Sequence, residues 1–171
     1  MHGWTGKILT VNLTEQTTDE LILHPDVYMR NIGGKGLSGE LLFENFCHTW
    51  KDPHMPLAFM TGPLNNTSSP TSGRMTVMSR SPLTGAVCDA SVGGKLGTVL
   101  KRAGYDGVVV TGKSDDWCGL SISENGVAFR NAAHLAGLPV SDIHSQLSAA
   151  PGMQNGAHAM VGPAAENGVR Y

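Results

Sequence analysis

The residues best suited to chemistry lie in a polar loop from Gly62 to Arg74, with the sequence GPLNNTSSPTSGR. Its glycines and prolines direct the backbone without bulky side chains, so several N–H groups and hydroxyls are expected to stay free. The guanidinium at its end can bind a phosphate through two parallel hydrogen bonds or stack on a flat heterocycle. The loop therefore predicts a cradle for a polar, phosphate-bearing ligand. From the residues alone, a solvated loop with a surface ion pair is the alternative.

A second glycine-rich segment, GKGLSG from Gly34 to Gly39, fits the G-x-G-x-x-G pattern that holds a pyrophosphate at a helix N-terminus. The segment before it, residues 27–32, includes Tyr28 and Arg30 and does not have the pattern of a buried strand. No parallel β-α-β unit is predicted after it. We therefore interpret the segment as a tight connection between two helices, with its backbone packed closely against another element.

Cysteine and histidine show no spacing typical of a metal or nucleophilic centre. Cys47, Cys88 and Cys118 are far apart and contain no C-x-x-C pair, which predicts reduced thiols and no zinc or iron-sulfur ligand set. The histidines contain no H-E-x-x-H or similar pairing, so no metal ligand is expected in this chain. They are His2, His24, His48, His54, His134, His144 and His158. The Cys47-His48 pair is not expected to act as nucleophile and base, because Cys47 is predicted to pack at the end of an apolar helical stripe.

Composition indicates a core-forming globular chain. Of its 171 residues 40% are hydrophobic and only 15% charged, against roughly 25% charged in an average soluble domain. A net charge of -2 supplies no basic field for nucleic-acid phosphates, which argues against non-specific nucleic-acid binding. The N-terminus lacks a basic region followed by an apolar run, and no stretch approaches the ~20 apolar residues that cross a bilayer. The expected location is the cytoplasm, without membrane contact.

Hydrophobic periodicity predicts short strands and short helices in alternation. Strands are expected at 7–13, 20–23, 57–60, 75–78, 86–90, 107–111, 120–123 and 127–130. Helices are expected at 26–32, 37–46, 95–103 and 140–147. The first two strands read as a hairpin, and Glu124-Asn125-Gly126 is a strong turn signal for the last pair.

An internal similarity suggests two related half-units. The segment AFMTGP at 58–63 resembles AMVGP at 159–163, and each is followed by a polar segment that ends near an arginine. The opening hairpin likewise resembles the hairpin at 120–130, and each precedes a predicted helix. If the chain is duplicated, the second half is expected to stop just where its strand after Arg170 should begin.

Collinear segments across the whole chain closely resemble the N-terminal domain of the tungsten-containing aldehyde:ferredoxin oxidoreductase family. They are GWTGKILTVNLT at 3–14, IGGKGL at 32–37, TGPLNNTSSPTSGR at 61–74, SRSPLTG at 79–85, SVGGKLG at 91–97, AGYDGVVVTGK at 103–113 and VGPAAENGVRY at 161–171. Because these segments keep their order over the whole chain, the resemblance is far more specific than any one glycine motif.

The resemblance implies an α+β fold of two β-sheets with short helices in a duplicated arrangement. Residues 1–171 would form an N-terminal domain that cradles a bis-pterin tungsten or molybdenum cofactor with a bridging magnesium. Members of the family oxidise aldehydes to carboxylic acids and pass electrons through a 4Fe-4S cluster to ferredoxin. The cluster cysteines, a second arginine-rich pterin loop and the substrate pocket lie in later domains, which this chain lacks. The chain alone is therefore expected to be inactive, as a fragment, a truncation product or a separately encoded part.

The resemblance also assigns site residues. Arg74 would contact the pterin phosphates and reach toward the cluster, and Gly93 would contact the cofactor through its backbone. Ser91 stands where many members have an asparagine whose backbone carbonyl helps hold the magnesium, a contact that survives the substitution. No catalytic residue is expected here. Expected partners are ferredoxin or another electron carrier, the remaining domains, an aldehyde and a second copy in a homodimer; the alternative function is a non-catalytic ligand-binding or assembly module.

Overall fold

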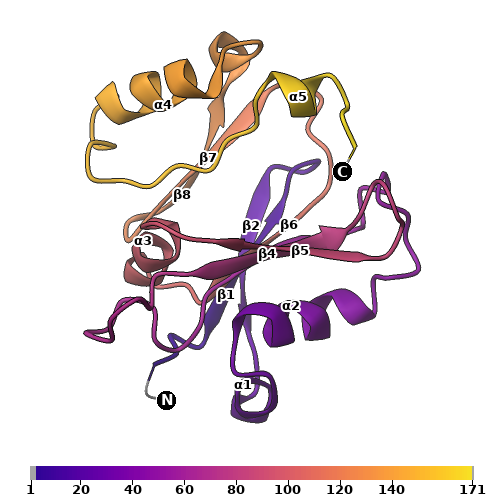
Figure 1. Cartoon of the computed structure of the whole chain (residues 1–171), viewed down its shortest axis with the longest axis vertical. Coiled ribbons are helices and arrows are strands. Elements are labelled where there is room, and N and C mark those ends of the chain that lie inside the picture. Colours follow the sequence, from indigo (N-terminus) through magenta and orange to yellow (C-terminus); the bar gives the residue numbers. More distant parts are fainter. Residues whose placement is uncertain (1–2, 171) are drawn as a thin grey trace.

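The computed structural model describes residues 3–170 and contains a six-stranded mixed sheet, a separate two-stranded hairpin and short helices (Figure 1). The strand order in the large sheet is β2-β1-β6-β3-β4-β5, and its neighbours pair antiparallel except for β1 and β6, which are parallel. The strands of this sheet are β1 (Lys7–Asn12), β2 (Thr17–Ile22), β3 (Leu57–Met60), β4 (Met75–Arg80), β5 (Val87–Val92) and β6 (Gly107–Thr111). The hairpin consists of β7 (Cys118–Ser123) and β8 (Gly126–Asn131). The predicted α+β fold with two sheets is confirmed.

Short helices accompany the sheets. They are α1 (Pro25–Asn31), α2 (Gly34–Phe43), α3 (Leu96–Arg102), α4 (Val140–Ala149) and α5 (Pro163–Glu166), with a single 3-10 turn at Ala133–Leu135. Figure 1 shows α1 and α2 below the large sheet and α4 and α5 above it. Within residues 3–170, no helix is both long and apolar enough to cross a bilayer.

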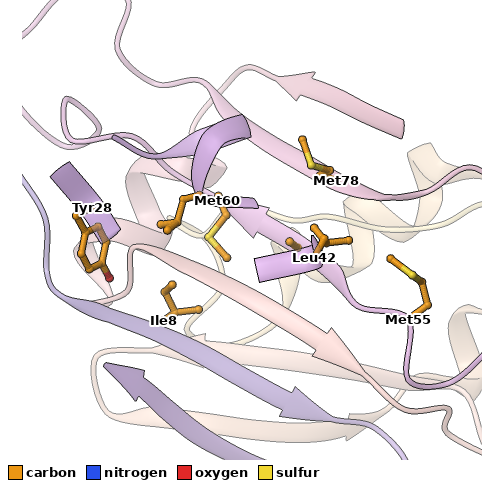
Figure 2. Packing of buried hydrophobic residues seen from close by; sticks show 8 residues of the cluster. Ile8, Tyr28, Leu42, Met55, Met60 and Met78 are labelled. Carbon is orange, nitrogen blue, oxygen red and sulfur yellow. The ribbon is translucent and has the colours of Figure 1, made fainter. Parts of the chain in front are cut away.

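Alternating side chains of the sheet fill a core on each of its faces. One core joins α1 and α2 to the sheet through Ile8, Tyr28, Leu42, Met60 and Met78 (Figure 2). The other core lies on the opposite face, where α3 and the hairpin cover the sheet. Its buried members are Leu9, Val11, Met75, Leu100, Tyr105 and Val108. Each large apolar side chain buried in this way contributes about 1.5–3 kcal/mol to the stability of the fold. The two cores therefore hold the sheet, and with it the ends of the loops that the strands carry.

The glycine-rich segment belongs to α2 itself, because the helix begins at Gly34, three residues before the predicted start. The close backbone approach that the sequence predicted is confirmed: a Cβ on Gly36 would lie 3.2 Å from the carbonyl carbon of Asn31. The helix ends at Phe43, so Cys47 lies beyond it and is exposed. The prediction that Cys47 packs at the end of this helix was therefore wrong, because the chain leaves the helix before the apolar stripe is complete.

The predicted duplication stays a prediction. The order of a hairpin, a helix and a Gly-Pro segment recurs, as the sequence suggests. The two similar segments nevertheless differ in structure, since Leu57–Met60 forms β3 whereas residues 157–162 form neither helix nor strand.

Candidate functional site

The structure brings Arg74 and Ser91 together. Arg74 Nη1 donates a hydrogen bond to Ser91 Oγ at 2.7 Å. The register of β4 and β5 explains the contact, because Thr76 lies opposite Ser91, and Arg74, two residues before Thr76, projects from the same face of the sheet. Continuing the register by one residue beyond the pair of Met75 and Val92 places Arg74 opposite Gly93. All three residues assigned by resemblance thus lie at one end of one strand pair.

The same face carries a second cation at the start of α2. Lys35 Nζ lies 2.8 Å from Asp89 Oδ2, and Asp89 precedes Ser91 by two residues on β5, so both point to the same side of the sheet. A Cβ on Gly34 would lie 3.2 Å from Thr76 Oγ1, which places the N-terminus of α2 directly over this strand pair. We call Lys35, Arg74, Asp89 and Ser91 the Arg74 cluster. Lys35 is paired with Asp89, so the charge of Arg74, which has no acidic partner among the described residues, and the positive end of a helix favour an anionic ligand.

Arg74 keeps donors for such a ligand. Its side chain is exposed, and the bond to Ser91 uses one of the five N–H groups that a guanidinium offers. Among residues 3–170 it forms no ion pair, so the surface ion pair considered as an alternative for this loop is not present. The bond to Ser91 holds the guanidinium beside β5 while leaving most of its edge accessible.

The Gly93-Gly94 turn offers open backbone next to Arg74. Both glycines are exposed, and a Cβ on either would meet no atom within 4 Å. Gly94 has a φ of +81°, which an L side chain rarely adopts. Gly73 packs against this turn, because a Cβ there would lie 2.9 Å from the carbonyl oxygen of Gly94. A ligand that contacts Arg74 can therefore approach the backbone of this turn without a side chain in its way.

The Gly62–Arg74 loop is held largely by its own polar groups. Asn65 Oδ1 accepts from the N–H of Gly62 at 2.7 Å, and the Thr67 and Ser72 hydroxyls donate to carbonyl oxygens of the loop at 2.7 and 2.9 Å. The expectation that the hydroxyls stay free is therefore wrong for Thr67 and Ser72. The loop borders a shallow hollow of about 290 Å³ that is mainly apolar and has Arg74 at its edge.

A larger cavity lies on the opposite face of the sheet. It has a volume of about 670 Å³ and lies between the end of β5, helix α4 and residues 154–160. Gly93 and Gly94 form part of its wall, together with Lys95 and the paired rings of His144 and His158, whose centroids are 5.7 Å apart. The Gly93-Gly94 turn therefore separates this cavity from the Arg74 cluster.

Sequence reasoning missed one cluster of polar side chains, formed by His48, Asp52 and His54 between α2 and β3. The three residues place one nitrogen or oxygen atom each within 4.8 Å of one another. The signal that could have found them is the spacing H-x-x-x-D-x-H, which a tight series of turns folds together. The three cysteines lie elsewhere, with Cys47 and Cys88 exposed and Cys118 partly buried. His2 lies outside the described residues.

Comparisons with known proteins agree on one family. The family model described as "Aldehyde ferredoxin oxidoreductase, N-terminal domain" matches residues 8–171. The chain is 38% identical to the tungsten-containing aldehyde ferredoxin oxidoreductase of Pyrococcus abyssi and 37% identical to that of Pyrococcus horikoshii, in each case over 100% of the chain and 28% of the relative. It is also 31% identical, over 86% of its length and 24% of the relative, to an "aliphatic sulfonate oxidoreductase, WOR-like subunit" of Pyrococcus furiosus.

A solved structure has the same fold. The active-site complex BamBC of benzoyl coenzyme A reductase, with 1,5-dienoyl-CoA, superposes with a TM-score of 0.83 at 28% sequence identity. The match covers 86% of this chain and 23% of that chain. The chain thus spans under a third of each of these proteins, and in the sequence relatives it corresponds to the N-terminal domain.

Proposed function

Because this chain belongs to the aldehyde ferredoxin oxidoreductase family, we propose that it holds the phosphate end of a bis-pterin tungsten cofactor within an oxidoreductase. The observation that carries the proposal is the bond from Arg74 to Ser91 beside the open backbone of Gly93. The word tungsten in the relatives' names supports the choice of metal. Molybdenum is the alternative metal that the experiment below distinguishes.

The residues present fit such a cofactor. The exposed guanidinium of Arg74 donates to phosphate oxygens, and the Ser91 hydroxyl orients it. The backbone carbonyl of Ser91 would be a ligand of the magnesium ion, and the backbone of Gly93, where an added Cβ would meet no atom within 4 Å, would contact the pterin. When bound, the cofactor supplies the redox chemistry that oxidises an aldehyde to a carboxylic acid. The role of this chain is to bind and orient the cofactor. We therefore propose no catalytic residue within 1–171.

The remaining parts of the enzyme complete the proposal. A 4Fe-4S cluster, a second pterin-binding arginine loop and the aldehyde-binding residues lie outside residues 1–171, and ferredoxin or a similar carrier accepts the electrons. The names of the relatives and of the solved structure support placing the substrate-binding residues outside this chain, because they refer to aldehydes, an aliphatic sulfonate and a coenzyme A thioester. A domain shared by proteins that act on such different molecules is not expected to select the substrate. A cytoplasmic homodimer is the proposed state.

The test is to purify the chain from its native host together with everything that co-purifies, and to measure tungsten, molybdenum, iron and oxidised pterin fluorescence. Stoichiometric tungsten and pterin are expected in the assembly that contains this chain. Arg74→Ala should lower both by about tenfold or more, because a charge-assisted hydrogen bond to phosphate is lost. Arg130→Ala is the matched control, since Arg130 is exposed on β8, away from the Arg74 cluster. An assembly with neither metal nor pterin would favour the non-catalytic module instead.

A further inference from the structure

The cluster of His48, Asp52 and His54 lies in the connection between α2 and β3, away from the Arg74 cluster. One carboxylate meets both rings: His48 Nδ1 lies 2.8 Å from Asp52 Oδ2, and His54 Nδ1 lies 2.9 Å from Asp52 Oδ1. The two imidazole rings are stacked, with centroids 5.4 Å apart and planes inclined by 27°. The two ring nitrogens therefore approach the two oxygens of one carboxylate, and one ligand atom from each of the three residues lies within 4.8 Å of the other two.

The backbone that carries these side chains is already fixed. The N–H of Asp52 donates to the carbonyl of Thr49 at 3.0 Å, and the N–H of Met55 donates to the carbonyl of Asp52 at 2.9 Å. Arg80 on β4 donates to the carbonyl of His48 at 2.7 Å. Met55 anchors the segment in the core. A ligand at this cluster would need little ordering of the chain, which lowers the cost of binding.

The donor set selects a class of ligand. Two imidazole nitrogens and one carboxylate oxygen are the ligands of zinc-type ions, which form bonds of about 2.0–2.2 Å to them. Tetrahedral geometry at these bond lengths separates ligand atoms by about 3.3 Å. To hold an ion, the contacts of 2.8 and 2.9 Å, which involve different oxygens of Asp52, need to widen by about 0.5 Å as the ion replaces the shared protons. The ligand atoms of the two imidazoles, which lie within 4.8 Å of one another, need to reach the same separation of about 3.3 Å. Calcium and magnesium are disfavoured, because they require mainly oxygen ligands.

We propose that His48, Asp52 and His54 form a binding site for a zinc-type divalent transition-metal ion. The His54 side chain is 78% exposed, so the ion can enter from solvent and its fourth position is open to water or to a ligand from outside the chain. Metal binding joins the end of the turn after α2 to the residues that lead into β3. Arg80 and Lys51 add positive charge nearby, which sets a moderate rather than a high affinity.

The experiment is a titration of the tag-free 171-residue chain with zinc, followed by calorimetry, and with cobalt, followed by its visible absorption. Every protein in the test carries Cys47→Ser, Cys88→Ser and Cys118→Ser, so that thiols cannot contribute. We expect one equivalent to bind, with the d–d absorption of a four-coordinate cobalt ion. Asp52→Asn and His54→Gln should each weaken binding at least tenfold. His24→Gln is the matched control, because His24 also lies beside an aspartate, at 3.3 Å from Asp26, but belongs to no group of three metal-ligating side chains among the described residues.

Folding and binding are separated by the metal-free melting temperature of each variant. Since Asp52 also accepts a hydrogen bond from the N–H of His54, Asp52→Asn could lower stability on its own account. His48→Gln, which leaves that bond in place, then decides the question and should also weaken binding at least tenfold. Binding of less than one equivalent of metal would overturn the proposal, and so would an affinity that is unchanged in His48→Gln and His54→Gln. Equal weakening by His24→Gln would overturn it too, because it would reveal non-specific binding to surface histidines.

Discussion

Lys101 Nζ lies 2.5 Å from Asp106 Oδ1, and both side chains are almost fully buried. The same carboxylate accepts the N–H groups of Thr5 and Gly6 at 3.0 and 2.8 Å. The ammonium also donates to the carbonyl of Gly62 at 3.2 Å, where the Gly62–Arg74 loop begins. One buried ion pair therefore ties the N-terminal segment, α3 and the candidate cofactor loop together.

Replacing Lys101 by methionine should destabilise the chain by about 3–5 kcal/mol, because it leaves the Asp106 carboxylate buried without its partner. Urea unfolding followed by circular dichroism measures the change. Lys113→Met is the matched control, because that lysine is exposed, and it should stay within about 0.5 kcal/mol of the parent chain. A loss below about 1 kcal/mol in Lys101→Met would show that the ion pair does not hold this junction.

Tyr28 should make stability fall at alkaline pH. Burial, and next the charge of Asp106, raise the pKa of its hydroxyl well above the usual value. A pKa raised in the folded state means that stability is complete below the unfolded value of about 10 and is lost as the pH rises above it. Unfolding free energies measured from about pH 9 to 11 should therefore decline, and Tyr28→Phe should reduce the decline.

Near neutral pH the same substitution should be close to neutral or stabilising. The buried Tyr28 hydroxyl lies near the Asp106 carboxylate but forms no hydrogen bond of normal geometry with any described residue, a situation that costs up to about 1–3 kcal/mol. Phenylalanine keeps the ring that packs 5.9 Å from Trp4, centroid to centroid. Equal alkaline declines in the parent and in Tyr28→Phe would contradict this account of the hydroxyl.

The two site residues Arg74 and Ser91 should differ in how much cofactor binding depends on their side chains. Ser91→Ala removes the hydroxyl that orients Arg74 but keeps the backbone carbonyl proposed to face magnesium. We therefore expect a smaller loss of tungsten and pterin in Ser91→Ala than in Arg74→Ala, measured per mole of the assembled enzyme. Arg74→Lys should resemble Arg74→Ala, because an ammonium cannot form two parallel bonds to phosphate. Full retention in Arg74→Ala would remove Arg74 from the cofactor site.

Local patterns predicted the strands and helices well because their causes are local. The hairpin around Glu124-Asn125-Gly126 and the strand Gly107–Thr111 follow from turn chemistry and a short apolar run. The place of β6 between β1 and β3 could not be predicted in the same way, because pairing over such a distance is decided by the packing of the whole sheet.

For the candidate site, too, the sequence predicted the residues but not the contacts between them. The loop composition pointed to Arg74, and the resemblance added Ser91 and Gly93. The bond between Arg74 and Ser91, however, depends on the register of β4 with β5, which no local pattern contains. The cluster of His48, Asp52 and His54 depends on consecutive turns after α2, in a segment for which the sequence pattern predicts neither a helix nor a strand.

The two glycines Gly36 and Gly39 of α2 should respond oppositely to alanine. A Cβ on Gly36 would lie 3.2 Å from the carbonyl carbon of Asn31 and closer still to its oxygen, whereas a Cβ on Gly39 would meet nothing within 4 Å. Gly36→Ala should therefore cost about 1–3 kcal/mol through the clash with backbone. Gly39→Ala should stabilise the helix by up to about 1 kcal/mol, because alanine loses less backbone entropy.

Urea unfolding of the two variants measures this difference directly, and each serves as the control for the other. The opposite signs follow from close packing between α1 and α2, which explains the G-x-G-x-x-G pattern without a nucleotide. If Gly36→Ala leaves stability unchanged and instead abolishes binding of a dinucleotide added to the chain, the pattern serves a pyrophosphate after all. If both variants destabilise equally, the helix rather than its contact with Asn31 determines the requirement for glycine.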